Sequence, residues 1–491
     1  MAGPADLSAR DAAKAVAAGT LKAEALVEAY LERTAAIEPK LRAFAYLEPG
    51  LARAQARAVD QARRKGALAG LPVGIKDIID TKDMPTECNS AIYRGRRPAT
   101  DADCVAAVRK ASGVVFGKTV TTEFAGSWPG PTANPYNSAH TPGGSSSGSA
   151  AAVAAGVIPL AFGTQTGGSV IRPASYCGCV GYKATRKSLS LKGVHPLAAD
   201  LDTLGLYART PDDILLFHAA VAGVKDSKPG ISRKPRFAVV RTKAWSSVGK
   251  ASAYLLEDAA RRLAPHAERI DQVELPPICD QAFDAQNVFI TAGIARAFDD
   301  IEKKHRDLLS VALLDAIAAG RVHSAARIAD SEAIRRASIA AADGFFKDYD
   351  AILTPAAADE APNGLRATGN PDFNRLWTFL ETPCVSLPVG LGPSGLPVGL
   401  QLVGSRGKDR ELLALSDWAF GILGAIAAPS LPAALPMAAL ARRAGLSLGA
   451  NLGHAWAEGD KVLQEMAAQM PRELAYEVEP AHVFVPSRRN R

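Results

Sequence analysis

The sequence predicts an α/β fold in which a mixed, largely parallel central sheet is flanked by helices on both faces. Short apolar runs of strand type alternate with helical stretches over residues 70–210, and such alternation favours a mostly parallel sheet. Apolar residues make up 48% of the chain and charged residues 22%, which are ordinary values for a globular protein. With 491 residues, the chain is also long enough to bury a large core.

The first expected elements are helices. Residues 7–65 are rich in Ala, Leu, Glu and Arg with helical periodicity, which predicts two or three amphipathic helices. Gly19 and Thr20 interrupt this segment, and Thr20 is placed to cap the helix that follows. Residues 70–210 then form the core of the domain. Its expected strands are the short apolar runs at 71–79, 114–116 and 157–162.

The second half of the chain adds a helical insertion and a closing part. Residues 250–348 are Ala-rich and almost free of Gly-Pro punctuation, so we expect a helical insertion there, on the substrate side. Further strands and a helix are expected over residues 350–425, which complete one domain of residues 1–425. Prolines return after residue 426. We expect residues 426–491 to be a C-terminal helical extension and tail, which could mediate a homo-oligomer.

The net charge, the cysteine spacing and the lengths of the apolar runs argue against several classes of protein. The net charge of +7 is mild for a chain of this length, so no nucleic-acid partner is expected. The Cys177-Gly178-Cys179 spacing is not that of a redox or zinc site, and neither a metal nor a cofactor is expected. No run of about 18 apolar residues suggests a membrane span, and the N-terminus lacks a signal-peptide core. The expected location is the cytoplasm.

Two clusters of serine and glycine stand out, at residues 142–150 and 163–174. Glycine allows tight turns and close approach of the backbone to a ligand. Successive N–H groups in such a loop can hold an anion, so a serine at its end could attack a carbonyl while they stabilise the oxyanion. The clusters therefore predict a serine nucleophile, although composition alone also allows solvated linkers.

A serine nucleophile needs a base, and lysine is the better candidate here. His140, His195 and His218 lie in no recognisable pattern. Lys76 stands inside the apolar run 71–79, and burial there would lower its pKa and make a neutral amine available. Taken alone, the pattern leaves open that Lys76 instead snorkels to solvent or pairs with a nearby aspartate.

Several motifs together resemble the amidase signature family. The resemblance runs from about residue 7 to about 425 in the expected order. It is carried by Gly74-Ile75-Lys76-Asp77, the Gly143-Gly144-Ser145-Ser146 cluster, Thr166-Gly167-Gly168-Ser169, Leu201-Asp202-Thr203-Leu204-Gly205 and the 396–404 segment. Because several long motifs occur in sequence, the resemblance is highly specific.

This resemblance implies the roles of the site residues. Ser169 is the nucleophile, Ser145 is the bridging serine after a cis peptide bond, and Lys76 is the base. The oxyanion hole consists of the backbone N–H groups of Thr166, Gly167, Gly168 and Ser169. Residues expected to shape the substrate pocket are Trp128, Gly144, Ser146, Phe373 and Trp377.

The activity implied is hydrolysis of a carboxylic amide, or of a urea- or carbamate-like C–N bond, in a small molecule through a seryl acyl-enzyme. Two alternatives stay open: the amidase-like subunit of a tRNA-dependent amidotransferase, and a catalytically inactive scaffold. Three residues depart from the usual family pattern. Ser147 stands where glycine is usual, Gln165 where aspartate is commoner, and Arg172 lies three residues after the nucleophile rather than two.

The motifs of other protein families match the sequence less well. Residues 144–148 also satisfy G-x-S-x-G, which would make Ser146 the nucleophile of an α/β-hydrolase elbow. That elbow needs a strand directly before it, whereas residues 134–142 read as loop. Residues 113–119 lack the first glycine of a P-loop, and the G-x-G-x-x-G at 390–395 is followed by a strand rather than a helix.

Overall fold

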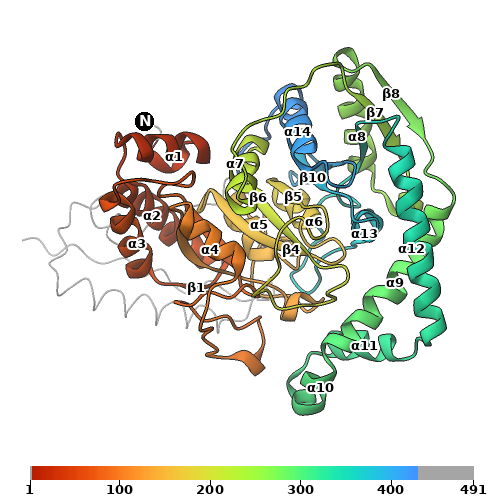
Figure 1. Cartoon of the computed structure of the whole chain (residues 1–491), viewed down its shortest axis with the longest axis horizontal. Helices are drawn as coiled ribbons and strands as arrows, with labels where there is room; N and C mark the ends of the chain where they lie inside the picture. The colour runs from red at the N-terminus through yellow and green to blue at the C-terminus, as the bar shows by residue number, and fades with distance from the viewer. Residues whose placement is uncertain (1–2, 430–491) are drawn as a thin grey trace, which may run out of the picture. The chain divides into compact units, whose positions relative to one another are not determined.

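A single eleven-stranded sheet organises the computed structural model, which describes residues 3–429 (Figure 1). The order of the strands across the sheet is β1-β3-β2-β4-β6-β5-β10-β11-β9-β7-β8. The strands are β1 (Phe44–Leu47), β2 (Pro72–Lys76), β3 (Val114–Thr119), β4 (Leu160–Gln165), β5 (Val180–Lys183), β6 (Thr203–Ala208), β7 (Arg236–Val240), β8 (Arg269–Val273), β9 (Ala351–Pro355), β10 (Cys384–Leu391) and β11 (Pro397–Val403).

The predicted mixed sheet flanked by helices is confirmed. Parallel pairing holds within two groups of three strands, β3-β2-β4 and β9-β7-β8. The strands between these groups pair antiparallel, so the expectation of a largely parallel sheet holds for the two groups and not for the middle. The physical reason is local: a short turn joins β10 to β11, and only antiparallel strands can be joined so tightly.

The N-terminal helices agree with the prediction: α1 (Ala9–Ala18), α2 (Ala23–Leu41) and α3 (Pro49–Gln61). Ser8 caps α1 by accepting a hydrogen bond from the Asp11 N–H, and Gly19 ends the helix with a φ of 77°. The expected capping role of Thr20 is wrong. Its hydroxyl donates to the carbonyl oxygen of Ala15 in the preceding helix, which leaves α2 to begin three residues later.

A short helix begins within each of the two clusters of serine and glycine. These helices are α5 (Ser147–Ala154) and α6 (Ile171–Cys177); the neighbouring helices α4 (Asp103–Lys110) and α7 (Pro211–Ala222) complete this part of the fold. Gly148, in the first turn of α5, lies so close to β3 that an added Cβ would be 2.2 Å from the Ala43 carbonyl oxygen and 2.4 Å from the Val120 nitrogen. The glycine is therefore required where this helix meets the sheet.

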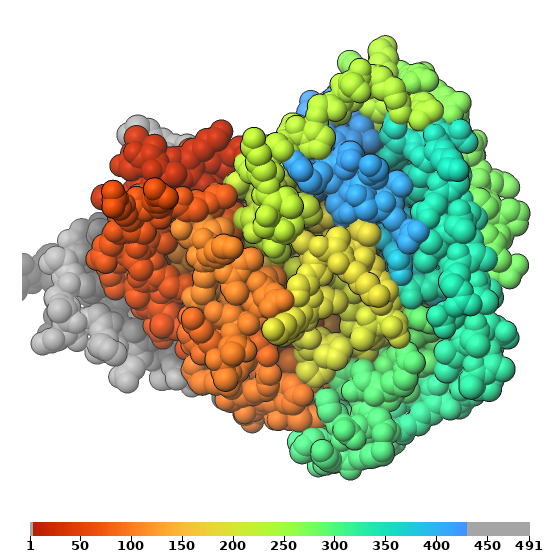
Figure 2. Space-filling view, in the orientation of Figure 1, coloured from red at the N-terminus to blue at the C-terminus, as the bar shows by residue number. Residues whose placement is uncertain are grey.

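The insertion between β7 and β9 is mainly helical: α8 (Lys250–Leu263), α9 (Ile278–Ala297), α10 (Asp299–His305), α11 (Val311–Arg321) and α12 (Ala325–Phe345). The prediction missed β8, which adds to the edge of the sheet beside β7. Helix α9 packs against both α11 and α12 (Figure 1). It also contacts the segment before β6, where Arg296 pairs with Asp200 at 2.9 Å; Figure 2 shows these two parts meeting at the surface.

Helices α13 (Asp372–Phe379) and α14 (Asp409–Leu423) belong to the closing part of the domain. The first precedes β10 in the sequence and supplies side chains to the candidate active site. The expected C-terminal extension, residues 426–491, lies outside the described residues except for its first four. Within residues 3–429, no helix is long and apolar enough to cross a membrane.

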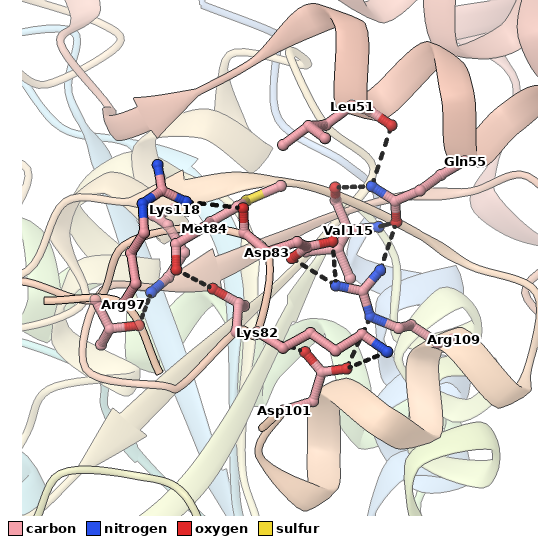
Figure 3. Close-up of polar contacts among 12 residues, drawn as sticks. Leu51, Gln55, Lys82, Asp83, Met84, Arg97, Asp101, Arg109, Val115 and Lys118 are labelled. Carbon is pink, nitrogen blue, oxygen red and sulfur yellow. Dashed lines mark hydrogen bonds and ion pairs between the residues drawn. The ribbon is translucent and has the colours of Figure 1, made fainter. Parts of the chain in front are cut away.

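The loop after β2 is fixed by a polar cluster around Arg109 of α4 (Figure 3). The Arg109 guanidinium donates to both carboxylate oxygens of Asp83 at 2.7 Å, to Asp101 at 3.0 Å and to the Gln55 amide oxygen at 3.0 Å. Gln55 in turn bonds to the backbone of Val115 on β3. The cluster thus ties the loop that follows β2 to α3, α4 and the sheet.

Candidate active site

Lys76 ends β2 and is fully buried. Its Nζ lies 2.7 Å from Ser145 Oγ and 2.7 Å from Thr164 Oγ1. Burial lowers the pKa of Lys76 from its ordinary value to about 7, because an ammonium ion loses its hydration there; Asp202 opposes this shift. Of the two sequence alternatives for Lys76, solvent exposure is excluded, and the amine meets a serine hydroxyl instead.

Ser145 lies in the loop before α5, directly after a cis peptide bond between Gly144 and Ser145, as the resemblance implied. Its carbonyl oxygen accepts a hydrogen bond from the Thr122 N–H at 3.2 Å. The side chain is buried and points at the lysine. The loop therefore presents the Ser145 hydroxyl directly to Lys76.

Ser169 lies between β4 and α6 and is half-buried, so its loop is open to solvent. The carbonyl oxygen of Ser169 accepts hydrogen bonds from the Ser146 N–H at 3.4 Å and from the Tyr207 hydroxyl at 3.3 Å. The first of these bonds joins the two serine clusters directly. Ser145 and Ser169 are thereby held on adjoining loops.

The loop 166–169 leaves its N–H groups unused. Its carbonyl oxygens accept hydrogen bonds: Gly167 O from the Thr378 hydroxyl at 2.9 Å, and Gly168 O from the Arg172 N–H at 3.1 Å. By contrast, the N–H groups of Gly167, Gly168 and Ser169 donate to no other group in residues 3–429. Three successive free donors beside a serine form a site that can accept an anion.

Two glycines in the site are required by close packing. A Cβ on Gly168 would lie 2.5 Å from Asn374 Oδ1, and a Cβ on Gly144 would lie 2.7 Å from Thr368 Cγ2. Asn374 of α13 and Thr368 of the preceding loop therefore form walls against the backbone at these two points. Gly144, one of the predicted pocket residues, contributes through this absence of a side chain.

Gln165 has a clear structural role. Its amide oxygen accepts hydrogen bonds from the Val170 and Ile171 N–H groups at 2.8 and 3.1 Å, and its amide nitrogen donates to the Thr378 hydroxyl at 3.0 Å. The side chain thus caps the first turn of α6 and links it to α13. A glutamine performs both tasks here because, unlike an aspartate, it carries a donor as well as an acceptor.

Arg172 is buried next to the cis peptide bond between Gly144 and Ser145. One guanidinium nitrogen donates to the Gly144 carbonyl oxygen at 2.8 Å and to the Thr368 hydroxyl at 3.1 Å. Its Nε and Nη1 atoms are buried without a hydrogen-bond partner among the described residues. Burial lowers the pKa of Arg172 to about 10. The third unusual residue, Ser147, donates its hydroxyl to the Val120 carbonyl oxygen and so anchors the start of α5.

The other predicted pocket residues are placed differently. Trp128 is 54% exposed, in the loop after β3. Phe373 and Trp377 are buried on α13, and Trp377 packs in a hydrophobic cluster with Ile171. A role in substrate binding stays a prediction for these three. Ser146 exchanges hydrogen bonds with the backbone of Thr164, and no strand precedes it in the described loop, which argues against the hydrolase elbow.

Sequence reasoning missed Thr164 and Asp202. Thr164 gives Lys76 its second partner, and Asp202 accepts a hydrogen bond from the Thr166 hydroxyl at 2.5 Å. Both lie within motifs of the sequence, but an alternating strand pattern does not tell which side chain faces a lysine on a neighbouring strand. Only the register of β2, β4 and β6 brings them together.

A separate cavity of about 350 Å³ is lined by residues of the segment 229–235, of the segment 346–350 that follows α12, and of the segment 404–415 that includes the start of α14. It shares no residue with the candidate active site. Its charged groups are paired with each other, as Arg233 is with Asp350. In the part of the chain that the structure describes, no group of three or more His, Cys, Asp or Glu side chains is arranged to hold a metal ion.

The described site thus combines a buried amine, in contact with a serine hydroxyl, and a glycine-lined loop on a mixed α/β sheet. The chain belongs to the Amidase family, whose profile matches residues 25–413, and the expected membership is confirmed. The proteins to which the chain is similar include amidotransferase subunits and a peptide amidase.

Two relatives match along most of their length. The chain is 31% identical to a subunit of glutamyl-tRNA(Gln) amidotransferase from Acidothermus cellulolyticus, with 82% of this chain and 92% of the relative covered. It is 30% identical to 2-amino-5-chloromuconic acid deaminase of Comamonas testosteroni, with 84% and 96% covered. Among solved structures, peptide amidase from Stenotrophomonas maltophilia matches with a TM-score of 0.73 at 27% identity, covering 87% of this chain and 99% of that one.

Proposed function

We propose that the protein is a serine amidohydrolase that cleaves the C–N bond of a small carboxylic amide through an acyl-enzyme on Ser169. The observation that carries this proposal is the contact between the buried Lys76 amine and the Ser145 hydroxyl at 2.7 Å. A neutral amine in that position can take the Ser145 proton while its own N–H donates to Thr164.

The proposed reaction has two stages. Lys76 accepts a proton from Ser145 as Ser145 accepts one from Ser169, and Ser169 Oγ attacks the amide carbonyl. The N–H groups of residues 166–169 hold the oxyanion, an interaction of the kind that lowers acyl-transfer barriers most. The proton returns through Ser145 to the leaving amine, so that the C–N bond breaks with a neutral leaving group. Water then hydrolyses the acyl-enzyme by the same proton route.

We further propose that the substrate carries a carboxylate close to the scissile amide. The buried Arg172 guanidinium, which bonds to the Gly144 carbonyl oxygen, places a positive charge next to the loop that carries Ser145, and this charge attracts an anionic substrate. One relative, the deaminase of Comamonas testosteroni, acts by its name on a muconic acid, which also supports an acidic substrate.

A fluorophosphonate probe tests the nucleophile. The wild type is expected to be labelled at Ser169, and S169A is expected to remain unlabelled and to lose several orders of magnitude in kcat/KM. Ammonia release is then measured on paired amides with and without an adjacent carboxylate, and the carboxylated member is expected to react faster. If the folded wild type takes no label, the proposal is wrong and the protein is an inactive scaffold.

The similarity to part of an amidotransferase supports a second candidate function. In that case the same acyl-enzyme chemistry would release ammonia for transfer to an acyl group on tRNA, with partner proteins and ATP. The activity of the purified chain without other proteins distinguishes the two candidate functions. A hydrolase turns over its amide without partners, whereas one component of an amidotransferase depends on co-purifying proteins and on ATP.

A further inference from the structure

Asp202 lies one residue before β6, opposite the end of β4, where Gln165 pairs with Thr203. Its carboxylate is buried and accepts four hydrogen bonds. The Thr166 hydroxyl donates to Oδ1 at 2.5 Å, and the N–H groups of Leu197 and Ala198 donate to Oδ2 at 2.9 and 3.1 Å; the Ala198 N–H also reaches Oδ1 at 3.3 Å. Thr166 is the first residue of the loop whose N–H groups are free. Asp202 therefore holds that loop at its first residue, Thr166.

Asp202 forms no salt bridge within the described residues. Burial raises the pKa of Asp202, whereas the hydrogen bonds from Thr166, Leu197 and Ala198 oppose this shift and stabilise the ionised form without cancelling its charge. Thr164 and Thr166, two residues apart at the end of β4, bring this carboxylate close to Lys76, because the Thr164 hydroxyl bonds to the Lys76 amine and the Thr166 hydroxyl bonds to Asp202. A buried carboxylate that is fixed by neutral groups near a buried amine favours the protonated form of that amine.

The other groups around Lys76 carry no comparable charge. Ser145 and Thr164 present hydroxyls, and burial raises the pKa of the Cys88 thiol, which keeps it protonated. Asp77, next to Lys76 in the sequence, forms an ion pair with Lys118 at 3.0 Å. The pair is internally compensated, so Asp202 supplies the unbalanced negative charge near the amine.

We propose that Asp202 is a positioning residue that anchors the oxyanion loop through Thr166 and sets the protonation of Lys76 through its charge. This inference rests on the proposed amidohydrolase function. The two actions are separable. Replacing Asp202 by asparagine removes the charge but keeps an oxygen for Thr166, whereas replacing Thr166 by valine removes the hydrogen bond but keeps the charge.

The experiment measures the rate of Ser169 labelling by a fluorophosphonate as a function of pH, which needs no knowledge of the substrate. In the wild type, the rate is expected to rise with pH through a midpoint near the pKa of Lys76, about 7. In D202N, the midpoint is expected to fall by about one pH unit, because a protonated amine loses its nearby anion. In T166V, the midpoint is expected to stay unchanged while the maximal rate falls about 3- to 10-fold.

Asp213 offers a matched control. It is also a buried carboxylate, and it accepts a hydrogen bond from a backbone N–H, that of Arg10, at 2.9 Å. It lies on α7, outside the loops that carry the serines. D213N is expected to keep the wild-type midpoint. T166S, which restores the hydroxyl, is expected to regain the rate that T166V loses.

The outcomes separate the two proposals. No labelling of wild-type protein contradicts the proposed function itself. Labelling of the wild type together with an unshifted midpoint in folded D202N overturns the inference about Asp202. If circular dichroism shows that D202N does not fold, the threonine pair still decides the anchoring role: equal rates for T166V and wild type overturn it.

Discussion

Among residues 3–429, the buried Lys76 amine forms hydrogen bonds only to hydroxyl groups, and this defines its chemistry at the residue scale. Burial lowers the pKa of Lys118 as well, but the Asp77 carboxylate at 3.0 Å opposes that shift and favours the charged form. Two hydroxyls cannot compensate an ammonium ion as well as water does, so the neutral amine is favoured. The neutral amine is the form that could act as the proposed base.

This charge state predicts the pH dependence of activity. Because burial lowers the pKa of Lys76 to about 7, kcat/KM is expected to fall tenfold per pH unit below pH 7 and to level off above it. K76M is expected to lose several orders of magnitude in kcat/KM at every pH. Amide hydrolysis followed from pH 5 to 9 checks both statements. A wild-type profile that is flat across pH 7 would contradict them.

Thr164 carries the second residue-scale prediction. T164V removes the hydroxyl that lies 2.7 Å from Lys76 Nζ and leaves a side chain of similar shape. The loss of one buried hydrogen bond, worth about 0.5–1.5 kcal/mol, is expected to lower kcat about 3- to 10-fold through a less well oriented amine. T34V is the control, since Thr34 is a buried threonine that bonds within α2. That variant is expected to keep kcat, and an equal loss in both variants would refute the role of Thr164.

The sequence predicted Lys76, Ser145 and Ser169 because their motifs are linear: each residue is marked by its own neighbours. It did not predict Asp202 or Thr164 as partners. These contacts cross from one strand or loop to another and depend on the register of β2, β4 and β6. Nor could composition reveal that Arg172 keeps two unpartnered nitrogens among the described residues, because this depends on packing around its guanidinium.

At the element scale, α5 depends on a glycine. A Cβ at position 148 would overlap the backbone of both Ala43 and Val120, and neither backbone can yield as a side chain could. The clash would push α5, and with it the Ser145 loop, away from β3. The start of this helix therefore controls both stability and the geometry of the site.

G148A is accordingly expected to lower the free energy of unfolding by several kcal/mol, in the range of severe overpacking, and to reduce activity as well. G344A serves as the control, because nothing lies within 4 Å of a Cβ added at this position in the last turn of α12. That substitution is expected to be neutral or to stabilise by about 0.5–1 kcal/mol. Thermal unfolding of both variants measures the difference; similar melting temperatures would contradict the packing argument.

Elements with a strong sequence pattern were predictable, whereas elements with a weak pattern were not. The helical periodicity of residues 7–65 indicated α1, α2 and α3, and Gly19 marked the first boundary. Strand β8 escaped prediction because its five residues, Arg269–Val273, mix charged and apolar side chains at the half-exposed edge of the sheet. An edge strand buries too little apolar surface to leave a clear signal.

At the scale of the whole molecule, Lys76 also links stability to pH. Its pKa in the folded chain is about 7, whereas an unfolded lysine titrates near 10.4. Between these values the unfolded chain binds a proton that the folded chain does not, so this residue makes stability rise with pH by about 1 kcal/mol per unit. Below pH 7 the contribution no longer changes, because both states are protonated.

Urea unfolding of wild type and K76M at pH 7, 8 and 9 tests this linkage. The stability of the wild type relative to K76M is expected to increase across the series, because methionine does not titrate. Groups other than Lys76 act on both proteins and cancel in the difference. A difference that stays constant with pH would mean that Lys76 remains protonated in the folded protein.

The overall architecture was predictable because alternation of strands and helices constrains how a chain can be layered. Which strands pair parallel and which pair antiparallel was less predictable. Strand direction depends on which strands become neighbours, and β5 lies beside β10, which is far from it in the sequence. Local pattern carries no information about such distant pairing.

The placement of α9–α12 has a consequence for how such enzymes diversify. This segment leaves the sheet after β8 and returns at β9, and both strands flank β7, so its two ends are anchored only one strand apart. Lys76, Ser145 and Ser169 lie in an earlier stretch of chain, between β2 and α6. A change in the length of this insertion therefore need not displace the strands that carry Lys76 and its neighbours, provided that the packing of α9 against α13 is kept.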